Sequence, residues 1–502
     1  MHRTLHSLSR SLRRQVPLLC LVASAAALHA GVAQALPAFA RQTGQNCVSC
    51  HAGGQFPELT PYGRIFKLTG YTIGERALPL SAMAVGSYAR VSDTTKSDAP
   101  ASDFQKNGQP LFASGSLFIA GKVTNNLGMF SQITYDNYAS QAVGPDGEPG
   151  AFKGHSQADN IDIRYADRFI DGTRDLIVGA SFNNNPSVSD VWNSAAAWMQ
   201  YVPVASPTSH QFVDGTAPYP AFGAGGNLAG LSVYAYWNRM LYGEVGTYRS
   251  ANRAFSFMSA GIADADTTKL HGANNPYWRL AYTHEWGAHN IMVGTSGMIA
   301  HIYDGGSDVA DPDNLGRIRN VGVDAQYQYI LDPHTITVQA AYMRQRQAYS
   351  ANTLAGAAPP YFQADGTTPV AAAGAADTTN TFRLKLSYIF QAKYGGSVAY
   401  FNRTGTANTL NQTSGYDSNG QITSTDPFET GVASTRVNGN LTGSPATRGI
   451  TFETFWIPVQ YVRVGAQYTA YAKYNGASDN YDGFGRNARD NNTLFLYLWA
   501  AY

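Results

Sequence analysis

Two of the chain's three cysteines lie close together near the start of the sequence, and a histidine follows them directly. The stretch is QNCVSCHAGG, residues 45–54, in which Cys47, Cys50 and His51 form a C-x-x-C-H motif. This is the attachment motif of a c-type haem. Each thiol adds to one vinyl group of the porphyrin, and the histidine binds the iron through its imidazole. We therefore predict one covalently attached haem c with His51 as the proximal iron ligand.

Two other chemistries use paired cysteines. A disulfide is stable in an oxidising compartment, but redox-active C-x-x-C pairs usually belong to a thioredoxin-like βαβ unit, and the sequence shows no such unit. A zinc site needs further Cys or His ligands, and residues 36–80 contain no histidine other than His51. The motif and its position together favour haem attachment.

The N-terminus has the pattern of a secretory signal. Its basic region contains Arg3, Arg10, Arg13 and Arg14. An apolar run from Val16 to Leu28 follows, and Ala33-Gln34-Ala35 offers a small-x-small cleavage site. We predict that residues 1–35 are a signal peptide and that Cys20 is removed with it. A retained anchor is the alternative, but the run is too short to span a hydrocarbon layer of about 30 Å.

The composition is typical of a β-rich chain. Charged residues make up 14% and aromatic residues 12% of the 502 residues, and the net charge is +1. This balance gives no attraction to nucleic acid, and we predict no nucleic-acid partner. After Ala35 no run of about 20 apolar residues occurs, so insertion into a membrane must use a closed barrel.

From Ser81 onward, apolar and polar residues alternate along short segments. In VGVDAQYQYI, residues 321–330, Val321 and Val323 fall on one face, and Asp324 and Gln326 fall on the other. A period of two is the pattern of a β-strand with one apolar and one polar face. The segments 335–345, 381–390 and 462–473 repeat it.

Short and long connections alternate along the same part of the chain. We expect tight turns at 124–126, 171–173, 238–239, 287–288, 332–333, 394–395 and 457–458. We expect long polar loops at 92–110, 138–157, 183–229, 251–276, 301–317, 347–379, 404–447 and 474–492. Outer-membrane barrels have this arrangement, with tight periplasmic turns and long outer loops. The sequence therefore predicts an all-β fold in which residues 81–502 form an antiparallel transmembrane barrel of about sixteen strands, facing outer-membrane lipid.

The motif-bearing segment, residues 36–80, is about 45 residues long. A free domain of this size usually needs a cross-link, a metal or a partner. We predict a small cytochrome c-like segment that plugs the barrel lumen or its periplasmic mouth. A cytochrome tethered below the barrel is the alternative. The charged residues predicted to face the lumen are interpreted mainly as pore lining, with contact to the plug or guidance of the electron donor as the alternative; they are Asp162, Arg164, Arg168, Arg383, Lys385, Glu453 and Arg463.

The sixth ligand of the iron is not evident, because residues 36–80 contain no methionine and no second histidine. The strand register points Met292, Met298 and Met343 toward the lumen, where a thioether could reach the iron. A gap-filling or pore-lining role is the alternative for each. An open or water-bound sixth position is a further alternative.

A longer run around the motif is similar to a known family. LPAFARQTGQNCVSCHAGGQFPELTPYGRIFKLTGY, residues 36–71, followed by a barrel-length tail, resembles the outer-membrane monohaem cytochrome–porin fusions that oxidise extracellular ferrous iron. The resembling residues are Pro37, Phe39, Ala40, Arg41, Gly44, Cys47, Cys50, His51, Pro57, Leu59, Gly63, Arg64, Phe66, Lys67 and Gly70. The rest of the chain is similar in architecture and length, and Tyr62 stands where the family pattern has Phe.

The resemblance implies electron transfer across the outer membrane. An extracellular donor, Fe(II), reduces the single haem held by Cys47, Cys50 and His51, and a soluble periplasmic cytochrome or other carrier accepts the electron. The activity would be that of an iron oxidase-like electron-transfer cytochrome. Two alternatives stay open: electron transfer with another donor or in the outward direction, and a diffusion or uptake porin with a haem-bearing plug.

Overall fold

The computed structural model describes residues 37–54, 56–93, 108–143, 149–194, 228–259, 270–304, 308–356, 374–411, 439–483 and 485–502. The predicted signal peptide, 1–35, lies outside these residues, as do parts of the predicted long loops.

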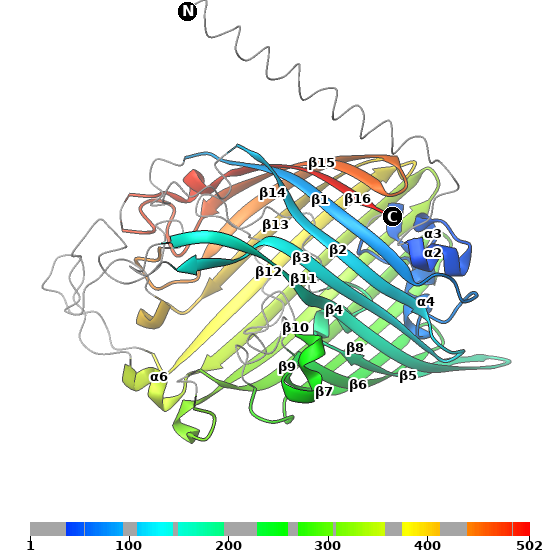
Figure 1. Ribbon diagram of the computed structural model, residues 1–502, viewed down its shortest axis with the longest axis horizontal. Coiled ribbons are helices and arrows are strands. Elements are labelled where there is room, and N and C mark those ends of the chain that lie inside the picture. Colours follow the sequence, from blue (N-terminus) through cyan, green and yellow to red (C-terminus); the bar gives the residue numbers. More distant parts are fainter. Residues whose placement is uncertain are drawn as a thin grey trace, which may run out of the picture.

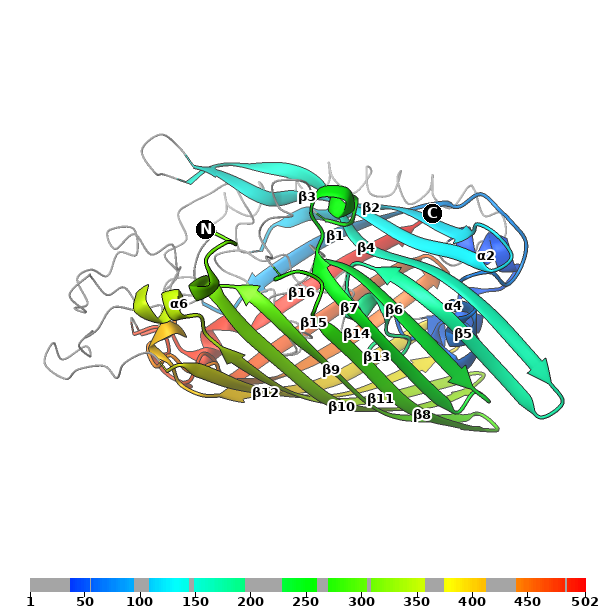
Figure 2. The same cartoon turned by 90° about the horizontal axis from the view of Figure 1, so that it is seen from below.

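The described chain forms one closed barrel of sixteen antiparallel strands in sequence order (Figures 1 and 2). The strands are β1 (Leu80–Val91), β2 (Pro110–Lys122), β3 (Leu127–Val143), β4 (Pro149–Asp171), β5 (Arg174–Asn183), β6 (Leu228–Trp237), β7 (Leu241–Ser250), β8 (Pro276–Trp286), β9 (His289–Tyr303), β10 (Leu315–Leu331), β11 (His334–Ala348), β12 (Ala376–Phe390), β13 (Tyr394–Gly405), β14 (Thr447–Val459), β15 (Val462–Lys473) and β16 (Thr493–Ala501). The first strand pairs with the last, and the Ala82 amide donates to the Tyr502 carbonyl at 2.7 Å. The predicted sixteen-stranded antiparallel barrel is confirmed.

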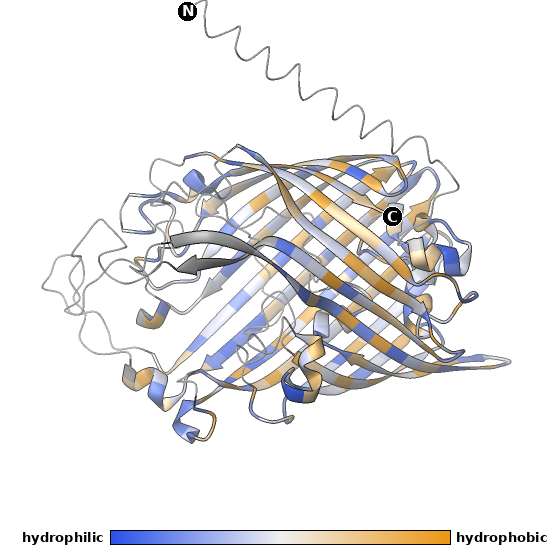
Figure 3. Ribbon diagram, viewed as in Figure 1, coloured by the Kyte–Doolittle hydropathy of each residue, from blue (hydrophilic) through white to orange (hydrophobic). Residues whose placement is uncertain are grey.

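The alternation of side chains decides which face of each strand meets the lumen. On β10, Val321 and Val323 are exposed on the outer face, whereas Asp324 and Gln326 are buried inside. Figure 3 shows the same alternation of hydrophobic and hydrophilic residues along most strands. The polar side chains of the inner faces can form hydrogen bonds with the N-terminal segment that lies inside the barrel.

The outer surface carries large exposed apolar side chains on many strands. They include Leu231, Val233, Val245, Leu280, Val293 and Leu386. Aromatic side chains such as Trp237, Trp286 and Tyr394 are exposed at the strand ends beside the short turns. An apolar outer band flanked by aromatic residues is the lipid-facing surface of an outer-membrane barrel. The surface therefore agrees with the predicted outer-membrane location.

Two of the expected tight turns lie a few residues away from their predicted positions. Tyr394-Gly395 belongs to β13, and the turn before it contains Gln391 and Ala392, whose φ angles are 53° and 52°. The pair at 457–458 belongs to β14, and the turn follows at Gln460 and Tyr461. Glycine and proline mark turns in general, but here the ladder hydrogen bonds of the neighbouring strands extend past them.

The segment before the barrel consists of short helices: α2 (Pro37–Thr43), α3 (Cys47–Cys50), the 3₁₀ turn η1 (Ala52–Gly54) and α4 (Pro61–Leu68). These helices gather at the short-turn end of the barrel, opposite α6 (Ala351–Gly356), which lies at the long-loop end (Figures 1 and 2). Residues 37–79 are called the plug below. Within the described ranges no helix is long and apolar enough to cross a membrane.

Placing a charge on the lipid-facing surface should destabilise the barrel. Val233 lies in the middle of β6 and is 55% exposed, so Val233→Arg would put a guanidinium into the hydrocarbon layer. We expect a loss of about 2–4 kcal/mol in the free energy of unfolding, measured by urea titration in lipid vesicles. Val233→Thr, which keeps the shape and adds one hydroxyl, is the control and should cost much less. Equal effects of both substitutions would contradict the assignment of this face to lipid.

Candidate haem site

The two cysteines of the motif lie on one turn of helix. In α3 the His51 amide donates to the Cys47 carbonyl at 2.8 Å, so Cys47 and Cys50 are placed one turn apart on one side. Neither cysteine forms a disulfide. Burial raises the pKa of Cys47 to about 12 and that of Cys50 to about 11, so both are protonated at neutral pH.

The residues after α3 hold His51 in place. His51 forms a β-bridge with Leu59, and the amides on either side of that bridge donate across it: Ala52 to the Glu58 carbonyl and Thr60 to the Cys50 carbonyl, both at 2.9 Å. The Phe56 ring lies 4.2 Å from the imidazole, centroid to centroid. The imidazole is thus oriented by backbone pairing and by an aromatic neighbour.

Helix α4 packs directly against α3. Thr60 caps α4 by accepting from the Gly63 amide at 3.1 Å, and its hydroxyl donates to the Ser49 carbonyl at 2.6 Å. A Cβ on Gly63 would lie 2.1 Å from the carbonyl oxygen of Cys50. No side chain fits at this distance, so a glycine is required where the two helices meet.

A cavity lies next to Cys50 and His51 and has mainly aromatic and apolar walls. The plug contributes Phe39, Phe56, Phe66 and Tyr71 to its lining. The Phe39 ring stacks on the Tyr71 ring with centroids 5.3 Å apart and meets the Phe66 ring edge-on at 5.0 Å. Such walls exclude water and suit the flat faces of a porphyrin.

The residues present fit a c-type haem. Cys47 and Cys50 would form the thioether bonds and His51 would bind the iron; when bound, the group supplies a one-electron couple. Cys50 and His51 line the cavity. Cys47 lies behind them, where its sulfur accepts from Gln460 Nε2 at 3.0 Å in the β14–β15 turn.

The three methionines predicted as candidate sixth ligands face the lumen side of their strands, but none lines the cavity. Met292 is buried in a cluster with Ile65 and Leu68 of α4. Met298 and Met343 pack in a separate cluster beyond it, with residues such as Tyr277 and Ile318. The cluster that contains Cys47 includes none of the three methionines. Their ligand role stays a prediction, and their packing matches the gap-filling alternative.

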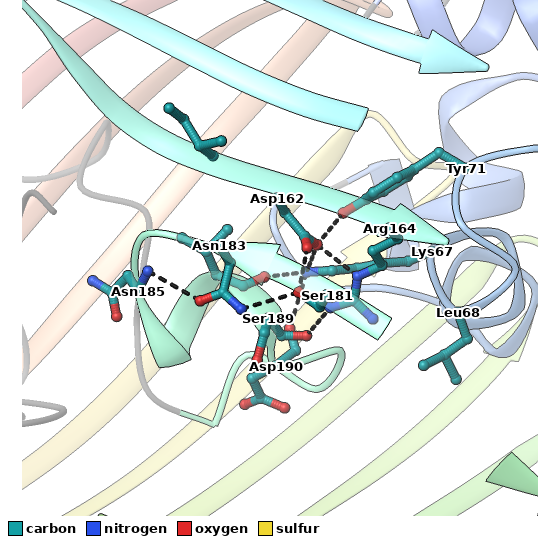
Figure 4. A network of polar contacts seen from close by, with 12 residues as sticks. Lys67, Leu68, Tyr71, Asp162, Arg164, Ser181, Asn183, Asn185, Ser189 and Asp190 are labelled. Carbon is teal, nitrogen blue, oxygen red and sulfur yellow. Dashed lines mark hydrogen bonds and ion pairs between the residues drawn. The ribbon is translucent and has the colours of Figure 1, made fainter. Parts of the chain in front are cut away.

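A polar network ties the plug to the barrel wall (Figure 4). Asp162 of β4 accepts from the Tyr71 hydroxyl at 2.6 Å, from Ser181 at 2.7 Å and from Arg164 Nε at 2.7 Å. Lys67 Nζ lies 3.9 Å from the same carboxylate. Of the charges interpreted mainly as pore lining, Asp162 therefore contacts the plug, and Lys385 does so as well, through Glu58 at 3.3 Å.

The chain after β5 turns into the lumen instead of outward. Residues 184–194, called the inward segment below, begin the stretch predicted as a long outer loop and contain α5 (Pro186–Ser189). Its Asp190 carboxylate lies 3.2 Å from Arg279 Nε of β8, and its Trp192 carbonyl accepts from Gln326 of β10 at 3.2 Å. Val188 and Val191 close one side of the cavity. Sequence patterns did not reveal this inward course.

Arg64 of α4 anchors the plug to the opposite wall. Arg64 is 2% exposed, and its guanidinium donates to Asn290 at 2.6 Å and to Gln326 and Gln328 at 3.2 Å each. Burial lowers the pKa of Arg64 to about 10, so it is charged at neutral pH. Neutral side chains of β9 and β10 thus satisfy a buried cation.

Removing this guanidinium should loosen the plug. Arg64→Met leaves three buried amide oxygens without their donor, at a cost of about 1–3 kcal/mol for each unsatisfied group. We expect faster cleavage of the plug by protease added from the periplasmic side, with the barrel intact. Arg174→Met, which removes an exposed cation at the start of β5, is the control. Equal cleavage rates for the two variants would mean that Arg64 does not anchor the plug.

The fold and the site together define a porin-like transmembrane barrel whose lumen holds a small helical plug. No protein-family model matches the chain, and no curated protein matches it in sequence. Solved structures with a similar fold include OmpT of Vibrio cholerae, with 9% identity and a TM-score of 0.40 over 84% of this chain and 96% of that chain. OmpF of Salmonella typhi in complex with daunomycin has 11% identity and a TM-score of 0.42 over 84% and 97%. OprB of Pseudomonas putida has 10% and 0.42 over 84% and 94%. These likenesses are too distant to bear on function.

Proposed function

We propose that this chain is an outer-membrane electron-transfer protein with a single haem c attached at Cys47 and Cys50 and ligated by His51. It accepts electrons from extracellular ferrous iron and passes them to a soluble periplasmic carrier. One observation carries the proposal: in a plug seated inside a membrane barrel, the Cys50 thiol and the His51 imidazole line an aromatic-walled cavity, and the Cys47 thiol lies behind them.

The position of the plug supports this role. Ferrous iron oxidised inside the cell would deposit ferric oxide there, so a redox group that meets the donor within an outer-membrane lumen avoids that damage. On the other side, Val48, between the two cysteines, is 42% exposed at the short-turn end. Gln45 and Asn46 are exposed beside it. This surface gives a periplasmic carrier access close to the attachment site.

The residues around the cavity position the group and exclude water. His51 is fixed by its bridge to Leu59 and by Phe56. The stacked rings of Phe39 and Tyr71 line the cavity within the plug. Ferrous iron loses one electron and no bond to carbon, oxygen or hydrogen is made or broken, so the reaction needs no acid or base from the protein.

The donor is supported by the resemblance of residues 36–71 to the iron-oxidising cytochrome–porin fusions. Another extracellular donor, or electron flow in the outward direction, uses the same site and is distinguished by experiment.

Ferrous iron added to whole cells that express the protein should reduce the haem. We expect the absorbance bands of reduced haem c in the wild type and none above background in His51→Ala, because the iron loses its protein ligand. His284→Ala is the matched control, since His284 is exposed on the outer face of β8, and it should behave as the wild type does. Haem that dithionite reduces but ferrous iron does not would exclude iron as the donor.

A diffusion or uptake channel with a haem-bearing plug is the second candidate. The closed sixteen-stranded barrel favours it, because barrels of this size enclose an aqueous lumen.

Liposome swelling separates the two functions. We expect no swelling in arabinose with the wild-type protein, because the plug and the inward segment lie in the lumen and bond to β4, β8, β9 and β10. Empty liposomes and an open porin give the lower and upper limits. Swelling near the upper limit without haem turnover would favour the channel.

A further inference from the structure

The cavity beside His51 contains little charge. Among the described residues that line it, Lys67 is the only lysine or arginine and Asp190 is the only aspartate or glutamate. The Asp190 carboxylate is engaged away from the cavity: it lies 3.2 Å from Arg279 Nε and accepts from the amides of Trp192 and Ser194. Lys67 is therefore the one cation that the described walls offer to a bound molecule.

The Lys67 ammonium keeps one donor for such a molecule. An ammonium has three N–H groups. Lys67 Nζ donates to the Val188 carbonyl and, at 3.2 Å, to the Asp190 carbonyl of the inward segment. Asp162 lies 3.9 Å away, beyond hydrogen-bond distance, and is itself paired with Arg164 at 2.7 Å. The third N–H group has no acceptor among these neighbours.

The position of Lys67 along α4 is set by Gly63. Residues four apart lie on the same face of a helix, about 6 Å apart along its axis. Gly63 rests on the Cys50 carbonyl, so Lys67 lies one turn farther along that face, away from the attachment site. Its side chain is 14% exposed, and burial lowers the pKa of Lys67 to about 8. The Asp162 carboxylate at 3.9 Å offsets part of the cost of burying this cation, and an anion in direct hydrogen-bond contact would offset more.

A c-type haem has the matching charge distribution. Its vinyl groups, which the thiols attack, lie on one part of the porphyrin edge, and its two propionate carboxylates lie on the edge away from them. We propose that Lys67 binds a haem propionate and thereby fixes the orientation of the porphyrin between the cysteines and the inward segment. This inference rests on the proposed haem and adds to it a positioning residue.

The orientation separates the two edges of the porphyrin. The propionate edge would lie toward Lys67, Val188 and Asp190, and the thioether edge would lie toward Cys50 and the exposed residues beside it. Lys67 also sets the electrostatic field at the iron, because ferric haem carries one more positive charge than ferrous haem and is disfavoured by a nearby cation.

The test compares purified holoproteins in which the charge at residue 67 is removed or kept. Lys67→Gln removes the charge and keeps a hydrogen-bond donor, whereas Lys67→Arg keeps both. Arg41→Gln is the matched control, since it removes a cation from α2 that does not line the cavity. Two quantities are measured: the midpoint potential by spectroelectrochemistry, and the propionate-bending band in the resonance Raman spectrum, which responds to hydrogen bonding at the propionates.

We expect Lys67→Gln to lower the midpoint potential and to shift the propionate band, and we expect Lys67→Arg and Arg41→Gln to leave both close to wild type. A Lys67→Gln protein with the wild-type potential and band would overturn the inference while leaving the haem proposal intact. An equal potential shift in Arg41→Gln, with an unmoved band in Lys67→Gln, would also overturn it. A wild-type protein without covalent haem would instead refute the proposed function.

Discussion

The structure depends on the polar inner wall of the barrel, which supplies hydrogen-bond partners to a plug that is too small to fold well alone. The plug has few residues to bury, and its longest helix, α4, carries one fully buried cation, Arg64, and one largely buried cation, Lys67. Burying a cation without partners is costly. Here the partners come from the barrel and from the inward segment: amide oxygens for Arg64, and backbone carbonyls for Lys67. The same contacts place the C-x-x-C-H motif at the mouth.

The inner wall is polar for the same reason that the outer wall is apolar. Side chains alternate between the faces of a strand, so a strand that presents Val321 and Val323 to lipid presents Gln326 and Gln328 to the lumen. The plug in turn provides most of the aromatic side chains that line the cavity beside His51, and Phe130 of β3 adds one from the wall. The barrel wall fixes the position of the plug, and the plug forms most of the surroundings of the proposed haem.

The sequence alone predicts the repetitive and local features. The period of two and the alternation of short and long connections predict the barrel. The spacing of Cys47, Cys50 and His51 predicts the haem-attachment motif. The inward course of residues 184–194 is not visible, because a polar stretch that folds inward has the composition of one that folds outward. The partners of Arg64 are invisible for another reason: they lie 226 to 264 residues away in the sequence. Two predicted turn positions were wrong, because β13 contains Gly395 and β14 contains Pro458.

The sequence separation of the Arg64 contacts has a consequence for the order of assembly. The plug precedes the barrel in the sequence, yet the groups that bind its cations lie on β4, β9 and β10 and in the inward segment. The barrel itself closes only when β16, the last strand, pairs with β1. Arg64 and Lys67 of the plug therefore gain these partners only after the later strands of the barrel have formed. Docking of the plug is therefore a late folding step, because it requires strands from β4 to β10 to be in place.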